Sequence, residues 1–122
     1  MQHVNSYDNF LVESLIIEAE EMLAKIEAKY EKKIDALQVK ADRHYEKDQE
    51  VPREDIQDTL IPLTQKMKQA EIALAKLKAA NKPQYASRIE KVKEMIQKLK
   101  NTYEKEYQNY RDDVDRERMG RY

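Results

Sequence analysis

The sequence predicts an all-α fold, an elongated antiparallel coiled-coil bundle of three long helices in an up-down-up arrangement. Large apolar residues recur in steps of three and four along most of the chain, which is the spacing of one helix face. Strong helix formers dominate the composition, and one Gly and three Pro among 122 residues leave few places to turn. Charged residues make up 39% and the mean hydropathy is -1.00, so we expect a thin apolar seam within a single domain over residues 1–122.

The first helix is predicted over residues 9–47. Residues 1–7 are expected to fray, and the side chain of Ser6 or Asp8 is expected to cap the helix by accepting a hydrogen bond from a free backbone N–H. Its apolar stripe consists of Val12, Leu15, Ala19, Met22, Ile26, Tyr30, Ile34, Leu37, Ala41 and Tyr45. Around Ile26–Leu37 the heptad slips to an eleven-residue spacing, which locally relaxes left-handed supercoiling.

Residues 46–53 are predicted to form the first turn, and residues 52–80 the second helix. Pro52 suits the first position of a helix, where the missing N–H would have no partner in any case. An unbroken heptad follows, made of Ile56, Leu60, Leu63, Met67, Ala70, Leu74 and Leu77. Pro62 lacks an N–H and crowds the carbonyl of Asp58, so a kink is expected there.

Asn81-Lys82-Pro83 is predicted to be the second turn, because Asn tolerates the left-handed conformation that closes helices. The third helix is expected over residues 84–119, where Gly120 would end it. Its stripe consists of Tyr85, Ile89, Val92, Ile96, Leu99, Tyr103, Tyr107, Tyr110 and Val114, with a second slip at Leu99–Tyr110. Parallel first and third helices would place the two slips side by side. The alternative fold is a two-helix hairpin, in which the second and third helices merge across a kink near Pro83.

The stretch Phe10–Ile17 is the densest apolar segment of the chain and is apolar over most of a helix circumference. The second helix is too short to cover it in an antiparallel arrangement, so it should extend beyond the other helices as an association surface. We expect a homodimer or a docked protein partner there. The predicted interface residues are Phe10, Leu11, Leu15, Ile16 and Ile17.

Charge is distributed unevenly along the chain, although the net charge is only -1. Residues 1–50 hold 7 Lys+Arg and 12 Asp+Glu, whereas residues 61–105 hold 11 Lys+Arg and 4 Glu. The acidic first helix is the obvious local partner for the later lysines. The alternative is a nucleic-acid surface, because lysine stripes neutralise phosphates and tyrosines can stack on bases. The residues that would form it are Lys91, Lys93, Lys98, Lys100 and Lys105, with Tyr103, Tyr107 and Tyr110 beside them.

Several kinds of chemistry find no matching pattern in the sequence. There is no Cys for a disulfide, a thiolate site or a Cys nucleophile, and no glycine-rich phosphate loop. Asp42 and His44 lie two residues apart, on different sides of a helix, so no metal site is expected. Ser6, Ser14 and Ser87 lack the strand-to-helix elbow of a nucleophile. We therefore expect no enzymatic activity and no cofactor.

No apolar run approaches the ~18 residues of a membrane span, and no secretory signal is visible. The sequence thus predicts a cytoplasmic, non-enzymatic structural or adaptor protein that binds a protein partner through helical coiled-coil surfaces. Assembly factors, scaffolds, chaperone-like proteins and inhibitors all belong to this class. Binding of nucleic acid through the second and third helices is the alternative function.

Overall fold

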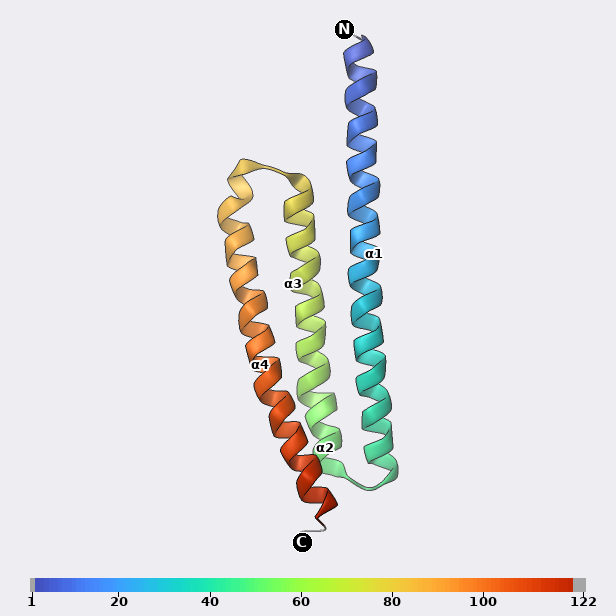
Figure 1. Cartoon of the computed structure of the whole chain (residues 1–122), viewed down its shortest axis with the longest axis vertical. Helices are drawn as coiled ribbons and strands as arrows, with labels where there is room; N and C mark the ends of the chain where they lie inside the picture. Colours follow the sequence, from blue (N-terminus) through green and yellow to red (C-terminus); the bar gives the residue numbers. More distant parts are fainter. Residues whose placement is uncertain (1, 120–122) are drawn as a thin grey trace.

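The computed structural model describes residues 2–119, with side chains described from residue 18 onward, and this range contains helices and no strand. The elements are α1 (Gln2–Glu46), α2 (Glu50–Glu54), the π-helical turn η1 (Asp55–Leu60), α3 (Ile61–Ala80), the 3-10 turn η2 (Pro83–Tyr85) and α4 (Ala86–Arg118). The chain runs along α1, returns through α3 and reverses again into α4 (Figure 1). The prediction of an all-α fold with three long helices is confirmed.

The helix after the first turn is continuous from Glu50 to Ala80, because the residues joining α2, η1 and α3 keep right-handed helical dihedrals. The disturbance predicted at Pro62 takes the form of a π-helical turn just before it. The N–H of Ile61 donates to the carbonyl of Ile56, five residues back. A wider turn accommodates a residue that has no N–H and crowds the preceding backbone. The helix starts at Glu50, two residues before the predicted start, so Pro52 takes its third position, still within the first turn, and not the first.

The first turn is shorter than the predicted 46–53 and closes in a Schellman arrangement. Asp48 has a φ of 56°, its N–H donates to the Tyr45 carbonyl, and the Gln49 N–H donates to the His44 carbonyl at 2.8 Å. A left-handed residue at this position is usually Gly, but Asp tolerates the conformation better than most side chains. The chain therefore reverses without a glycine, and α2 begins at Glu50.

The second turn separates α3 from α4, so the alternative of one merged helix across Pro83 is wrong. Asn81 has φ 50° and ψ 46°, as predicted for the residue that closes the helix, and its N–H donates to the Lys78 carbonyl. Lys82 is extended, and Pro83 begins the short 3-10 turn that leads into α4. An extended residue before a proline avoids the steric clash that disfavours helix there.

The predicted start of the first helix was wrong. The backbone of residues 2–8 belongs to α1, so Ser6 and Asp8 lie within the helix and not at its start. At the other end α4 stops at Arg118, and Gly120 lies outside the described residues. The first turns of α1 continue past the connection between α3 and α4 (Figure 1), as the unequal helix lengths predict.

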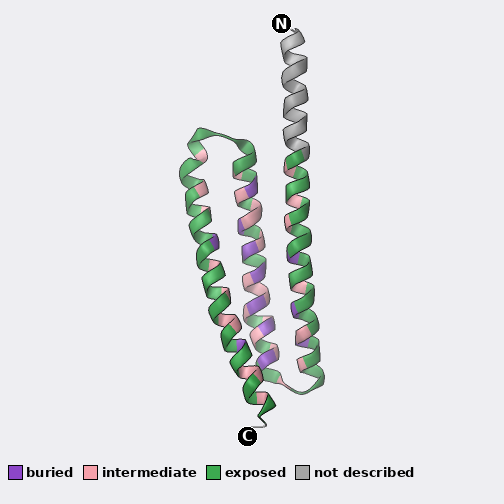
Figure 2. Cartoon of the chain, viewed as in Figure 1, coloured by how far each residue is buried: buried purple, intermediate pink, exposed green. Residues whose placement is uncertain are grey.

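The buried residues lie mainly on the continuous helix Glu50–Ala80, whose α3 part packs against both α1 and α4 (Figure 2). A core cluster gathers near the 47–49 turn and consists of Leu37, Ala41, Ile56, Leu60 and Tyr110. Burying each Leu or Ile side chain contributes roughly 1.5–3 kcal/mol. Farther from this turn α3 buries Ala70 and Ala75, which supply less apolar area. The helices are therefore held most strongly at the end where the core cluster lies.

The buried face of α1 departs from the predicted stripe near its end. Tyr45 is 67% exposed, whereas the neighbouring His44 is half-buried against α4. Met22 is also mostly exposed, and Leu23 is half-buried instead. On α3, Thr64 is buried although the apolar pattern passed over it. His44, which lies outside the predicted stripe, therefore replaces Tyr45 on the packed face of α1.

Candidate functional site

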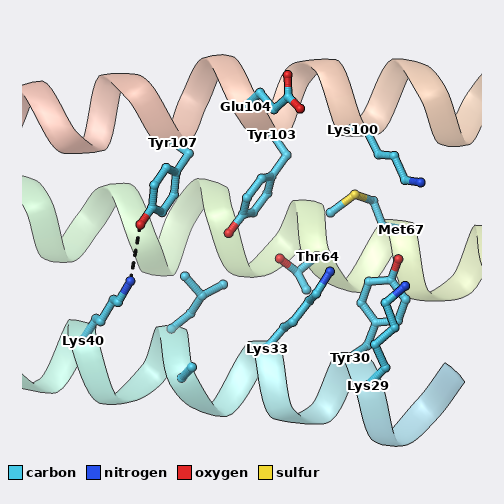
Figure 3. Close-up of a pocket in the computed structure, with 12 residues that line it drawn as sticks. Lys29, Tyr30, Lys33, Lys40, Thr64, Met67, Lys100, Tyr103, Glu104 and Tyr107 are labelled. Atoms are coloured by element: carbon cyan, nitrogen blue, oxygen red, sulfur yellow. Dashed lines mark hydrogen bonds between the residues drawn. The ribbon is translucent and has the colours of Figure 1, made fainter. Parts of the chain in front are cut away.

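A groove runs between α1 and α4, with α3 as its floor. Its larger cavity has a volume of about 490 Å³ (Figure 3). This cavity is lined by Lys29, Tyr30, Lys33, Ala36, Leu37, Lys40, Thr64, Met67, Lys100, Tyr103, Glu104 and Tyr107. A second cavity, of about 240 Å³, continues it toward the α3–α4 connection and is lined by Met22, Ile26, Glu71, Leu74, Ala75, Lys78, Ile96 and Lys100. We refer to both together as the groove.

The two heptad slips predicted from the sequence meet in this groove. Tyr30 and Leu37 come from the first slip, whereas Tyr103 and Tyr107 come from the second. An up-down-up path makes α1 and α4 parallel, and the two slips lie at similar distances from the ends of these helices at Glu46 and Arg118, so they reach the same level (Figure 1). The sequence thus predicted that these tyrosines lie at the same level along the bundle axis, but it did not predict an open groove between them.

Two buried polar side chains line the groove, Thr64 on its floor and Tyr30 on its α1 side. The Thr64 hydroxyl donates to the Leu60 carbonyl at 2.8 Å. Tyr30 is only 1% exposed, and burial together with the neighbouring Glu71 carboxylate raises the pKa of its hydroxyl above the usual value. A tyrosine with a raised pKa stays neutral at physiological pH. Met67 and Leu74 supply the apolar part of the floor, beside Glu71.

Four lysines line the larger cavity, and three of them come from α1, the helix that the sequence marked as acidic. The ammonium groups of Lys29 and Lys33 each lie 5.2 Å from the centre of the Tyr30 ring. Lys29 also pairs with Glu71 at 3.7 Å. Lys40 donates to the Tyr107 hydroxyl at 3.3 Å. Lysine stems cover apolar surface while their ammonium groups stay near water, so the groove is apolar below and positive along its rims.

One wall of the groove is a row of tyrosines on α4. The rings of Tyr103 and Tyr107 are stacked with centres 6.0 Å apart, and Tyr110 follows at 5.6 Å from Tyr107. Burial raises the pKa of both Tyr103 and Tyr110. Tyr110 belongs to the core cluster, and the other two pack against it. These rings are thus partly used in folding, as their place in the apolar stripe suggested.

The five lysines proposed for nucleic-acid contact are all exposed, but they do not share one face of α4. Lys100 lines both cavities of the groove. Lys93 pairs with Glu90 of the same helix at 3.3 Å. Residues two apart, such as Lys98 and Lys100, point to different sides of a helix. The heptad set Lys91, Lys98 and Lys105 therefore lies away from the groove lysine.

The predicted protein-interface residues concern the first turns of α1. The side chains of Phe10, Leu11, Leu15, Ile16 and Ile17 lie outside the described residues. The backbone of α1 at this point lies beyond the turn that joins α3 to α4 (Figure 1). The role of these residues as an interface stays a prediction.

An acidic cluster that the sequence did not reveal lies between η1 and α4. The Oδ2 atom of Asp55 is buried and, among the described residues, has no hydrogen-bond partner. Burial first, and then the nearby carboxylates of Asp113, Glu106 and Glu54, raise the pKa of Asp55 to about 7. Arg116 partly balances the cluster, since its guanidinium contacts Asp113 at 3.0 Å. No sequence pattern could pair residues this far apart in the chain.

Asp42 and His44, which the sequence analysis tested as metal ligands, have other partners. The Asp42 carboxylate accepts a hydrogen bond from Gln38 at 3.0 Å. Both ring nitrogens of His44 are engaged, with Gln49 and Tyr110. Within the part of the chain that the structure describes, no group of three or more His, Cys, Asp or Glu is arranged to hold a metal ion.

None of the helices described in the structure has the length and hydropathy needed to cross a bilayer.

Comparison of the chain with protein-family models, with curated proteins and with solved structures found no significant match.

Proposed function

We propose that the protein is a non-enzymatic structural or adaptor protein, and that it binds an acidic amphipathic helix of a protein partner in the groove. The observation that carries this proposal is the arrangement of α1 and α4 on either side of α3. Between them lies a long groove with an apolar floor and lysines on its rims. Helix-in-groove binding uses such a surface, with apolar anchors spaced three and four residues apart.

The shape of the groove supports a helical occupant. The groove follows the α3 residues Thr64, Met67, Glu71, Leu74 and Lys78, which form one face at helical spacing. A helix placed there would contact α1, α3 and α4 at once and complete a four-helix arrangement. The direct links between α1 and α4, such as Lys40 with Tyr107, lie toward the end with the core cluster.

The chemistry of the groove favours binding over catalysis. The hydroxyl of Tyr30 is held neutral by burial and by Glu71, and that of Thr64 is bonded to the backbone. Lys33 and Lys100 have exposed side chains on opposite rims, where they can pair with carboxylates of a bound helix. Pairs at an interface rim act mainly on partner selection and association rate.

The test compares two charge reversals of equal size in the full chain. K33E/K100E reverses the groove rims, whereas K32E/K98E changes exposed lysines of the same two helices outside the groove. Tagged protein is used to capture partners from a lysate of the native host. Wild type and K32E/K98E should retain the same protein partner, and K33E/K100E should lose at least about 90% of it. Equal capture by all three forms would exclude the groove as the binding surface.

The same experiment addresses nucleic-acid binding, the alternative function. A nucleic-acid partner would be released steeply by salt, because lysine contacts displace condensed counterions. Its binding would weaken with the K98E change, since Lys98 belongs to the set proposed for phosphate contact. Recovery of mainly nucleic acid by wild type, with loss in K32E/K98E, would favour this alternative over the groove.

A further inference from the structure

We propose that the groove is filled by the acidic segment of a second copy of this chain, residues 2–21 of α1, in a symmetric dimer where each copy fills the groove of the other. This inference rests on the proposed function and names the partner helix. Three observations support it: the position of the segment in its own chain, its charge and its length.

The acidic segment cannot reach the groove of its own chain. It belongs to the continuous helix α1, which carries its first turns past the α3–α4 connection and away from the groove (Figure 1). Folding it back would require a break in α1, and residues 2–46 form one uninterrupted helix without Gly or Pro. A second chain, in contrast, can place the same segment beside α3 without bending it.

The charges of the segment and the groove are opposite. Residues 2–21 contain five carboxylates and no Lys or Arg, the carboxylates being Asp8, Glu13, Glu18, Glu20 and Glu21. Five lysines and two glutamates line the groove, namely Lys29, Lys33, Lys40, Lys78 and Lys100 with Glu71 and Glu104. Complementary potentials of this kind orient an incoming helix, and they disfavour an orientation that brings like charges together.

The length and the hydropathy of the acidic segment also match the groove. At 1.5 Å per residue the segment is about 30 Å long, and the part of α1 that borders the groove, from Met22 to Lys40, is about 27 Å long. Six of the eight residues in Phe10–Ile17 are large and apolar, more than one narrow helix seam needs. The groove floor offers Met67 and Leu74, and α4 adds Ile96.

In a dimer of two antiparallel copies, both grooves are filled at once. If the two α1 helices run side by side in opposite directions, each acidic segment lies along the groove of the other chain. Such an interface is isologous and closes after two copies, so it gives a dimer and no filament.

The test is a charge swap read by sedimentation equilibrium. One variant, E13K/E20K, reverses two carboxylates seven residues apart, and the other, K33E/K100E, reverses the groove rims. Wild type should sediment at twice the chain mass of 14.6 kDa. Each variant alone should dissociate at least ten-fold more readily. An equimolar mixture should regain the dimer, since both of its docked segments again meet opposite charge.

The matched control K32E/K98E should sediment like wild type. Recovery in the mixture also shows that both variants fold, and helical circular dichroism checks this for each alone. A mixture that stays as dissociated as its parts would overturn the inference, and so would a dimer that K33E/K100E leaves unchanged.

Failure of this inference can be distinguished from failure of the proposed function. A monomeric wild type that still captures a host protein through Lys33 and Lys100 would overturn the dimer and leave the proposed function standing. If K33E/K100E changes neither the oligomeric state nor partner capture, both proposals are wrong.

Discussion

The Nε2 atom of His44 lies 2.7 Å from the hydroxyl oxygen of Tyr110, which joins the end of α1 to α4 across the core cluster. The other ring nitrogen, Nδ1, lies 2.7 Å from Oε1 of Gln49 in the first turn. Because Oε1 can only accept, Nδ1 donates, and Nε2 of the neutral ring accepts from Tyr110. One imidazole thus connects three parts of the chain. The two rings also meet edge to face, with centres 5.6 Å apart.

Replacing Tyr110 by Phe tests this connection. The ring remains in the core cluster, but His44 loses a hydrogen-bond partner, so we expect a loss of about 1 kcal/mol in the free energy of unfolding. Urea denaturation followed by circular dichroism measures it. The control is Y45F, since Tyr45 is largely exposed and its ring contact with Arg53 would survive. Equal stability of Y110F and wild type would show that water replaces the hydroxyl.

Asp55 should make stability fall as pH rises. The unfolded carboxyl titrates near 3.8 and the folded one near 7, so between these values the folded chain keeps a proton that the unfolded chain has lost. This contribution to the free energy of unfolding is therefore fully present below about pH 4 and decreases as the pH rises to about 7. Above that pH the free energy of unfolding no longer changes on account of Asp55. The groups that face Asp55 are Asp113, Glu106 and Glu54, with Arg116 bound to Asp113.

D55N should remove that pH dependence. Because the site is partly open to solvent, we expect D55N to be more stable than wild type at pH 8 by about 1–2 kcal/mol, with little difference at pH 4. Denaturant titrations at both pH values measure this, and D58N, an exposed carboxylate of the same turn, is the control. A constant difference between D55N and wild type from pH 4 to 8 would contradict the prediction.

L15E/I16E should weaken self-association or partner binding more than it affects folding of one chain. Burying each Leu or Ile contributes roughly 1.5–3 kcal/mol, so the loss should exceed that of any exposed ion pair. We expect sedimentation to shift from dimer toward monomer while most helical circular dichroism remains. V39E, at an exposed apolar position of α1 outside the groove, is the control. Global loss of helix would show that these residues belong to the core of a single chain.

Solution scattering should report an elongated particle. A globular chain of this length has a radius of gyration of about 14 Å. α1 alone, at 1.5 Å for each of its 45 residues, is about 67 Å long. Measured on L15E/I16E at low concentration, the radius should clearly exceed the globular value. A value near 14 Å would mean that α1 does not stay extended in solution.

Local features of the fold were predictable from the sequence. The three long helices follow from apolar spacing and helix propensity, because both act within a few residues. The left-handed Asn81 and the place of Pro52 in the first turn of a helix follow from the backbone preferences of those residue types. The parallel directions of the first and third helices, which the alignment of the two slips requires, followed from the two turns. None of these inferences needed a partner helix.

What depends on contacts between distant residues was decided by the tertiary structure. Ala41 is followed at helical spacing by both His44 and Tyr45, and packing against Tyr110 of α4 selects His44, whereas the more apolar Tyr45 stays exposed. The raised pKa of Asp55 comes from α4, which no local pattern can indicate. The groove exists because α3 lies between α1 and α4 and leaves one face of all three uncovered. The apolar periodicity indicates which residues are candidates for the core, but packing between the helices determines which of them are buried.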